Sequence, residues 1–205
     1  GGNVGVVVAP KGLCLVDGGL TASSAGLLDA AASVSGGAVR VLFNTHWHFD
    51  HVGSNELLGR GGTRIVAHEN VRARLSVRFM SDAFERTFEP LVAGGLPGQT
   101  FTDGGIMAFG AERVEYRHIP EAHTDGDAYV FFPNANVLHT GDLGWNGLYP
   151  VIDYSVGGWI GGMVTALDEL LNVGDAETRI IPGHGPLARK DDLRASRDML
   201  ARVHE

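Results

Sequence analysis

An α/β fold, with two β-sheets packed face to face and helices on their outer sides, is the architecture that the 205-residue sequence predicts. Runs typical of β-strands alternate with helical patterns, and this alternation occurs in two similar halves of the chain. The composition, 44% apolar and 20% charged, suits one compact globular domain over residues 1–205 with a sizeable core.

The first half begins with a hairpin, because two β-rich runs flank the turn "APKG". Helical and strand-like segments then follow in alternation. The expected strands are residues 4–8, 13–16, 38–43 and 63–68, and the expected helices are residues 21–34, 55–62 and 69–76.

The second half repeats this pattern with a longer final helix. The expected strands are residues 113–119, 127–133, 136–140 and 178–183, and the expected helices are residues 157–173 and 190–203. Between the halves, residues 77–104 mix aromatic residues with glycine. This composition is compatible with a mobile flap or a small helical insertion over a site, and we assign it no regular structure.

Charge and hydropathy exclude several classes of partner. The formal net charge is −8, without a basic cluster, so we expect no nucleic-acid partner. No apolar run approaches the roughly 20 residues of a membrane-spanning helix, so we expect no membrane partner and a soluble protein. It would be cytoplasmic, or periplasmic or secreted if a leader has been removed. The single cysteine, Cys14, excludes an internal disulfide and is expected to be a small buried hydrophobe.

The most informative stretch is "NTHWHFDHVGSNE", residues 44–56, which directly follows an expected buried strand. His46 and His48 are two residues apart, so in an extended segment both imidazoles point the same way and can bind one cation. Asp50 and His51 come where the chain turns into the next helix and can reach a second position beside the first. These four side chains are more ligands than one ion needs.

Three further candidates each follow an apolar run and lie close to glycine or proline. They are His123 in "EAHTDGD", Asp142 in "VLHTGDLG" and His184 in "IIPGHGP". Together the set has five histidines, two carboxylates and no thiolate, which makes zinc the first choice, with iron or manganese as alternatives.

Other polar residues receive structural interpretations. His68, His118 and His139 are expected to be structural or core histidines, His204 is expected to be exposed, and Asp125 and Asp127 are expected to be turn residues. Trp145, Asn146 and Tyr149 follow Asp142 on an expected loop, where contact with substrate and ordinary packing are both open.

These motifs, taken in order, resemble those of the metallo-β-lactamase fold hydrolases. "THWHFDH" is similar to their His-x-His-x-Asp-His signature, and "AHTDGD", "HTGD" and "PGHG" are similar to their later motifs. The resemblance implies an αββα four-layer sandwich with two mixed β-sheets. It also implies a first site of His46, His48 and His123, a second site of Asp50, His51 and His184, and Asp142 bridging both. Asp17 would orient the metal-binding loop from outside the ligand set.

The function expected from this resemblance is that of a dinuclear zinc hydrolase acting on a small molecule. A hydroxide bridging two ions would attack a carbonyl, and Asp50 would orient it and move protons. The bridging Asp142 favours an ester, thioester or lactone, as in glyoxalase II and lactonases. The alternatives are β-lactam hydrolysis and a mononuclear iron persulfide dioxygenase. Diiron oxygen-reducing relatives are disfavoured because they usually carry Glu where this chain has His48. The specific substrate, the physiological metal and the oligomeric state stay open.

Overall fold

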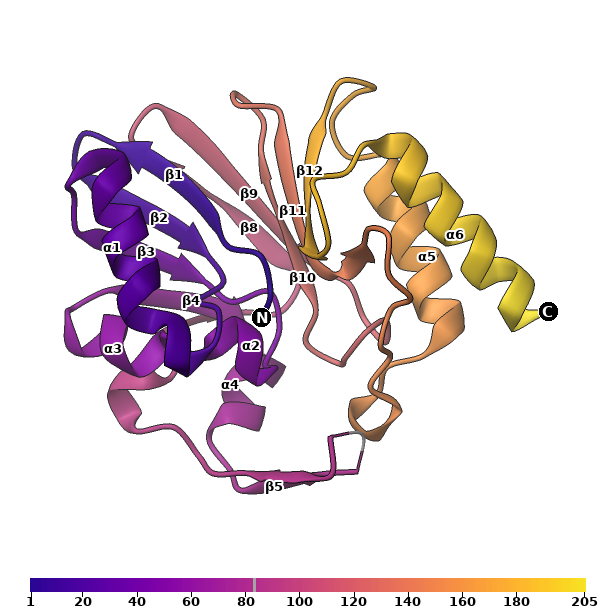
Figure 1. Cartoon of the computed structure of the whole chain (residues 1–205), viewed down its shortest axis with the longest axis horizontal. Helices are drawn as coiled ribbons and strands as arrows, with labels where there is room; N and C mark the ends of the chain where they lie inside the picture. Colours follow the sequence, from indigo (N-terminus) through magenta and orange to yellow (C-terminus); the bar gives the residue numbers. More distant parts are fainter. Residues whose placement is uncertain (83) are drawn as a thin grey trace.

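Two five-stranded β-sheets form the centre of the computed structural model, which describes residues 1–82 and 84–205 (Figure 1). In the first sheet β1 and β2 are antiparallel, and the remaining neighbours are parallel. Its strands, in spatial order, are β1 (Gly5–Ala9), β2 (Gly12–Val16), β3 (Val39–Phe43), β4 (Arg64–His68) and β7 (Gln99–Phe101).

The second sheet is antiparallel except where β11 lies parallel to β12. Its strands, in spatial order, are β12 (Arg179–His184), β11 (Val137–Trp145), β10 (Ala128–Phe132), β9 (Glu112–His118) and β8 (Gly104–Phe109). Both sheets are therefore mixed, as expected.

The core between the sheets follows from the two-residue period of strand side chains. Cys14 and Val16 of β2 face inward and pack with Phe43 of β3 against Val130 and Phe132 of the second sheet. Burying this inner face removes apolar surface from water, at roughly 25 cal/mol per Å², and holds the two sheets together.

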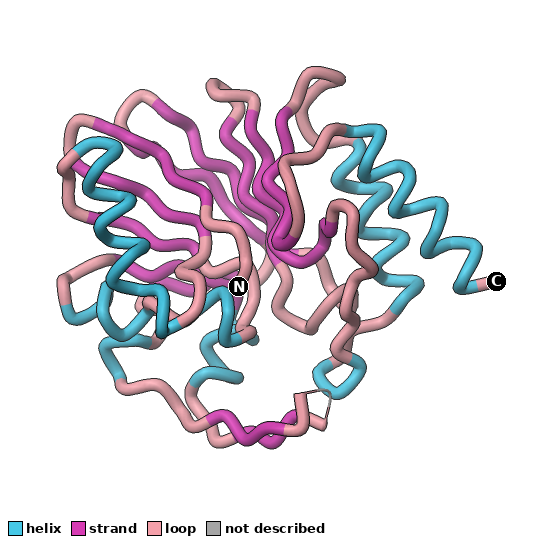
Figure 2. The backbone as a smooth tube through the Cα atoms, viewed as in Figure 1, coloured by secondary structure: helices cyan, strands magenta, loops and turns pink. Residues whose placement is uncertain are grey.

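Helices cover the outer face of each sheet, which completes four layers in the order αββα (Figure 2). On the first sheet, Leu27 and Leu28 of α1 pack with Leu58 of α3 against Leu15 and Leu42. On the second sheet, α5 and α6 pack against β10 and β11. The helices are α1 (Ser24–Ser35), α2 (Phe49–Val52), α3 (Asn55–Arg60), α4 (Glu69–Leu75), α5 (Ile160–Leu171) and α6 (Lys190–His204), with 3-10 turns η1 (Thr21–Ser23), η2 (Ala93–Gly95) and η3 (Tyr154–Val156).

Residues 77–104 differ from the helical insertion considered above. They form a small antiparallel hairpin of β5 (Phe79–Ser81) and β6 (Arg86–Phe88), then η2, and then β7 at the edge of the first sheet. Ala83 lies outside the described residues. Strands of three residues carry too little alternating pattern to be recognised in a sequence.

No helix among the described residues is both long enough and apolar enough to span a membrane.

Candidate metal centre

The seven candidate ligands lie together where strands and their connections end at one edge of the two sheets. His46 and His48 follow β3, whereas Asp50 and His51 belong to α2. His123 lies in the connection between β9 and β10, and His184 is the last residue of β12. Asp142 lies inside β11, which continues to Trp145, so the expectation that it follows the end of a strand was wrong. The register of β11 against β12 shifts between Gly141 and Trp145.

Two groups of side chains have the spacing needed to hold metal ions. In each group the possible ligand atoms all lie within 4.8 Å of one another. The first group comprises His46, His48, His123 and Asp142, and the second comprises Asp50, His51 and His184. Asp142 also reaches the second group, because its Oδ1 is 3.1 Å from His51 Nε2 and its Oδ2 is 3.3 Å from His184 Nε2.

Hydrogen bonds outside the first group determine which ring nitrogen of each histidine is free. The assignment comes from the bonding network, since the partner of one nitrogen fixes the tautomer. His48 Nε2 donates to Asp153 Oδ2 at 3.0 Å, and His123 Nδ1 donates to the carbonyl of Val151 at 2.7 Å. Their other nitrogens, His48 Nδ1 and His123 Nε2, therefore present lone pairs to each other at 2.9 Å.

His46 completes this arrangement through a relay. Thr45 Oγ1 donates to Asp17 Oδ2 at 2.8 Å, so the hydroxyl oxygen accepts from His46 Nδ1 at 3.0 Å. His46 Nε2 then carries a lone pair and has no hydrogen-bond partner among the described residues. Three buried nitrogen lone pairs that converge repel one another unless a cation or a proton lies between them. The donor set therefore fits a metal ion.

Asp17 forms hydrogen bonds to the second group and to the segment that precedes it. Asp17 Oδ2 accepts from His51 Nδ1 at 2.8 Å, which directs His51 Nε2 toward Asp142 and His184. Asp17 Oδ1 accepts from the backbone N–H of Thr45 at 2.8 Å. Its φ of 65° lies in the left-handed region that non-glycine residues seldom adopt. A carboxylate with three donors on two different metal-binding segments positions both of them.

Burial and charge act in opposite directions on the histidines of the two groups. Burial, reinforced by the neighbouring His51, holds the pKa of His46 well below its usual range, and burial lowers the pKa of His123 to about 4. Burial also opposes protonation of His184, but its hydrogen bonds to the carboxylates of Asp142 and Asp50 outweigh this effect and raise its pKa to about 9. His51 shows the same balance, with a pKa well above its usual range because of Asp142 and Asp17. Without a metal, protonated His51 and His184 therefore balance the negative charge of the carboxylates beside them.

Asn3 forms hydrogen bonds to the segment that carries His184. Asn3 donates its backbone N–H to the carbonyl of Gly183 at 2.7 Å, and its side-chain amide donates to the carbonyls of Pro182 and Gly185, each at 2.9 Å. Gly183 is required here, because a Cβ at this position would lie 1.9 Å from Asp142 Oδ1. No sequence pattern pointed to Asn3.

The three residues expected near the mouth have different environments. Trp145 ends β11 rather than lying in a loop, and its ring stacks on His184 with centroids 4.1 Å apart and an interplanar angle of 25°. Its Nε1 donates to the carbonyl of Asp142 at 2.9 Å. The amide of Asn146 donates to the carbonyls of Pro186 and Leu187, so it is occupied within the protein. Tyr149 is 84% exposed.

The structural interpretations of the remaining histidines and Cys14 hold. His68 caps α4, because its Nδ1 accepts from the N–H of Asn70, and its ring stacks on His118 at 3.7 Å. His118 Nδ1 also contacts the carbonyl of Asp127 at 2.8 Å. His139 and Cys14 are buried, and His204 is exposed.

The two acidic residues after His123 also act as expected in the turn. Asp127 accepts from the backbone N–H groups of His123 and Thr124, both at 2.7 Å. Asp125 forms an ion pair with Arg74 at 2.7 Å.

Asp153, like Asn3, is a residue of the centre that sequence reasoning missed. It is fully buried, contacts His48, and accepts from Ser155 N at 3.1 Å as the N-cap of η3. The only local signal is an Asp two residues before a Ser, which is typical of a capping turn and carries no information on His48.

The fold and the ligand geometry together define a metallohydrolase-like class of protein, and comparison with known proteins agrees. The model of the metallo-beta-lactamase superfamily matches residues 1–198, so the chain belongs to this superfamily. A metallo-beta-lactamase from Pontibacter korlensis superposes with a TM-score of 0.78 at 22% identity, covering 96% of this chain and 85% of that one. The BLEG-1 B3 metallo-beta-lactamase superposes with a TM-score of 0.76 at 20% identity, covering 97% and 94%. At these identities the likeness concerns the fold.

Sequence relatives carry a different name. The hydroxyacylglutathione hydrolase of Brucella anthropi is 29% identical over 123 residues, which are 60% of this chain and 40% of that protein. The hydroxyacylglutathione hydrolase of Gloeobacter violaceus is 33% identical over 103 residues, which are 49% of this chain and 33% of that protein. The chain thus matches well under half the length of these curated relatives.

Proposed function

We propose that this protein is a hydrolase that uses two zinc ions to cleave the acyl C–O bond of an ester or lactone, or the acyl C–S bond of a thioester. The observation that carries the proposal is the convergence of two ligand groups on Asp142, with buried histidine lone pairs already directed inward by Asp153, Val151 and Thr45. The relatives named hydroxyacylglutathione hydrolase support a thioester, because their name describes hydrolysis of an acylated glutathione.

His46, His48 and His123 would hold one ion, Asp50, His51 and His184 the other, and Asp142 would contact both. Bound zinc supplies Lewis-acid polarisation of a carbonyl and makes a hydroxide nucleophile available near neutral pH. The protein would contribute fixed ligand tautomers and a buried setting that strengthens electrostatic interactions.

Asp50 has the geometry of a proton-transfer residue. Its side chain is 16% exposed, and its Oδ2 is 3.3 Å from His184 Nε2 and 3.6 Å from His51 Nε2. Burial raises the pKa of Asp50, but the hydrogen bond from His184 and the charge of His51 prevail and bring it below its ordinary value. The carboxylate is therefore ionised at neutral pH and can accept the proton of an attacking water and deliver it to the leaving group.

Asp142 bears on the choice of substrate. A carboxylate between two cations partly neutralises them, which weakens their attraction for the carboxylate that every classical β-lactam carries. An uncharged ester, thioester or lactone carbonyl loses less from this neutralisation. We therefore expect kcat/KM for the best such substrate to exceed that for penicillins and carbapenems by at least roughly tenfold, or about 1.4 kcal/mol.

The test is a steady-state comparison of zinc-loaded protein with S-lactoylglutathione, aryl esters, lactones, phosphodiesters and β-lactams, paired with elemental analysis. Two zinc ions per chain and a preference for the carbonyl substrates other than β-lactams are the expected results. A β-lactam as the best substrate would contradict the substrate assignment. One tightly bound iron with oxygen consumption on a persulfide would contradict hydrolysis itself.

A further inference from the structure

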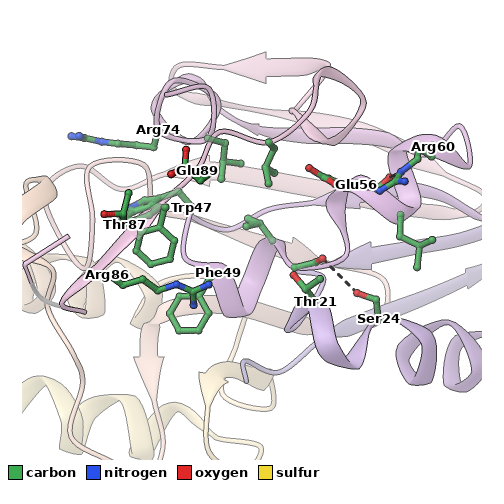
Figure 3. A pocket seen from close by; sticks show the side chains of 16 residues that line it. Thr21, Ser24, Trp47, Phe49, Glu56, Arg60, Arg74, Arg86, Thr87 and Glu89 are labelled. Carbon is green, nitrogen blue, oxygen red and sulfur yellow. Dashed lines mark hydrogen bonds and ion pairs between the residues drawn. The ribbon is translucent and has the colours of Figure 1, made fainter. Parts of the chain in front are cut away.

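A cavity lies behind the metal-binding loop, between that loop and the β5–β6 hairpin (Figure 3). Its volume is about 500 Å³, which is in the usual range for sites that take small molecules. None of the seven candidate metal ligands lines it. Trp47 lies between His46 and His48 in the sequence, and successive side chains of an extended segment point to opposite sides. Its side chain lines this cavity.

The walls of the cavity are mainly apolar. Trp47, Val52 and Leu75 are buried residues of the loop, α2 and α4, and Phe88 and Leu91 come from the hairpin and the segment after it. A ligand that fills this space must therefore have an apolar body, since an unpaired polar group here would lose its hydrogen bonds to water.

The charged residues on the rim are paired, with one exception. Arg60 pairs with Glu56 at 3.2 Å, and Arg74 pairs with Asp125. Glu89 pairs with Arg78 at 3.0 Å.

Arg86 is the exception, because its guanidinium forms no ion pair with any described residue (Figure 3). It lies over the rings of Phe49 and Phe88, 5.4 Å and 5.1 Å from their centroids. Stacking of this kind holds the guanidinium in place while its N–H donors stay free for an anion.

We propose that this cavity binds an aliphatic carboxylate, with the chain among the apolar walls and the carboxylate on Arg86. A guanidinium recognises a carboxylate through two parallel hydrogen bonds, which a point charge does not match. The site is separate from the proposed hydrolysis and needs no reaction at the metal centre.

The occupied cavity would also steady the metal-binding loop. Phe49 stacks on Phe88 with centroids 5.8 Å apart, and Phe84 contacts the ring of His48 edge-on at 4.9 Å. The hairpin thus touches the cavity on one side and a candidate metal ligand on the other.

Decanoate is a suitable probe, with decanol and butyrate as matched probes that lack the charge or the long chain. Calorimetric titration of the full zinc-loaded chain should show saturable binding of decanoate and much weaker binding of butyrate. Arg86→Met keeps the aliphatic part of the side chain and should weaken decanoate binding at least tenfold, with decanol affinity changed by less than about twofold. Arg113→Met removes an exposed charge from β9 and serves as the control, with no expected effect.

Tryptophan fluorescence locates the ligand within the protein. Trp47→Phe should remove the response to decanoate, whereas Trp145→Phe should keep it, because Trp145 stacks on His184 at the metal centre. The proposal is overturned if decanoate binding does not saturate. It is also overturned if Arg86→Met lowers the affinities for decanoate and decanol equally, or lowers neither. A fluorescence response that is lost in Trp145→Phe would overturn it as well. The last result would place the carboxylate on the metal ions.

Discussion

Replacing Asp153 by Asn should weaken zinc binding although Asp153 is not itself among the seven ligands. Its Oδ2 accepts from His48 Nε2 at 3.0 Å, and its Oδ1 accepts from the backbone N–H of Ser155 at 3.1 Å. An asparagine has one acceptor oxygen where the carboxylate has two. It can bond either His48 or Ser155, and its NH₂ group must then face an N–H donor on the other side.

The magnitude follows from leaving one buried donor without an acceptor. Such a loss costs about 1–3 kcal/mol. If the loss falls on His48, zinc affinity decreases roughly 10- to 100-fold, which is also the range typical of groups that orient metal ligands. If Ser155 loses its hydrogen bond instead, we expect η3 to be less stable and the zinc affinity to change less.

Chelator competition on zinc-loaded protein measures this affinity directly, and denaturant unfolding of the same variant measures the stability cost. Ser155→Ala is the matched control, because it removes only the hydroxyl contact on the far oxygen of Asp153 and leaves the bond to His48. We expect less than about a threefold change in affinity for this control. An Asp153→Asn protein that holds both ions as tightly as the wild type would refute the role assigned to Asp153.

Three further predictions concern the metal centre and the core. His184→Ala should release one of two zinc ions selectively, whereas His46→Ala should weaken the other, and elemental analysis after dialysis distinguishes the two; loss of both ions from each variant would contradict two separable groups. Zinc affinity should rise as the pH rises toward about 9, because the pKa of His184 is raised to about 9 by Asp142 and Asp50 and zinc must displace that proton; calorimetry in buffers of different ionisation enthalpy should detect its release. Burial raises the pKa of the Cys14 thiol to about 12, so a thiol reagent should react at a detectable rate only after unfolding, and rapid labelling of native protein would contradict the buried position.

Local pattern made much of the fold predictable. The longer helices and most of the longer strands carry regular apolar spacing, so their order along the chain could be predicted from residues alone. The six-residue strand β8 and the four-residue helix α2 are not among the expected elements. The β5–β6 hairpin and β7 could not be predicted, because each strand has three residues and its stability depends on contacts made elsewhere. Tertiary packing decides such segments, as Phe88 shows by stacking on Phe49 of a helix far away in sequence.

The candidate ligands were predictable for a different reason. Each follows an apolar run of the sequence that predicts a strand, and the fold brings the segments after these runs to a common edge of the two sheets. The residues that orient the ligands leave no such trace. Asp153 is 105 positions from His48, and Asn3 is 179 positions from Pro182, and neither is of a residue type that is rare in turns. Their roles follow from which atoms the fold brings together.

The apolar core between the sheets and the candidate metal centre consist of different residues. This separation explains how the chain can share a fold with proteins that it matches at only 14–22% identity. The apolar cluster between the sheets joins β2 and β3 to β9 and β10 without including any of the seven candidate ligands. Stability of the sandwich thus depends on volume and hydrophobicity at those positions, which many sequences satisfy. The candidate ligands and the groups that contact them lie at one edge of the sheets, several of them in connections, where a changed loop costs the core little. The family therefore determines the architecture, whereas under the proposed function Asp50, Asp142, the hairpin and the segment after β11 would determine which substrate the protein can use.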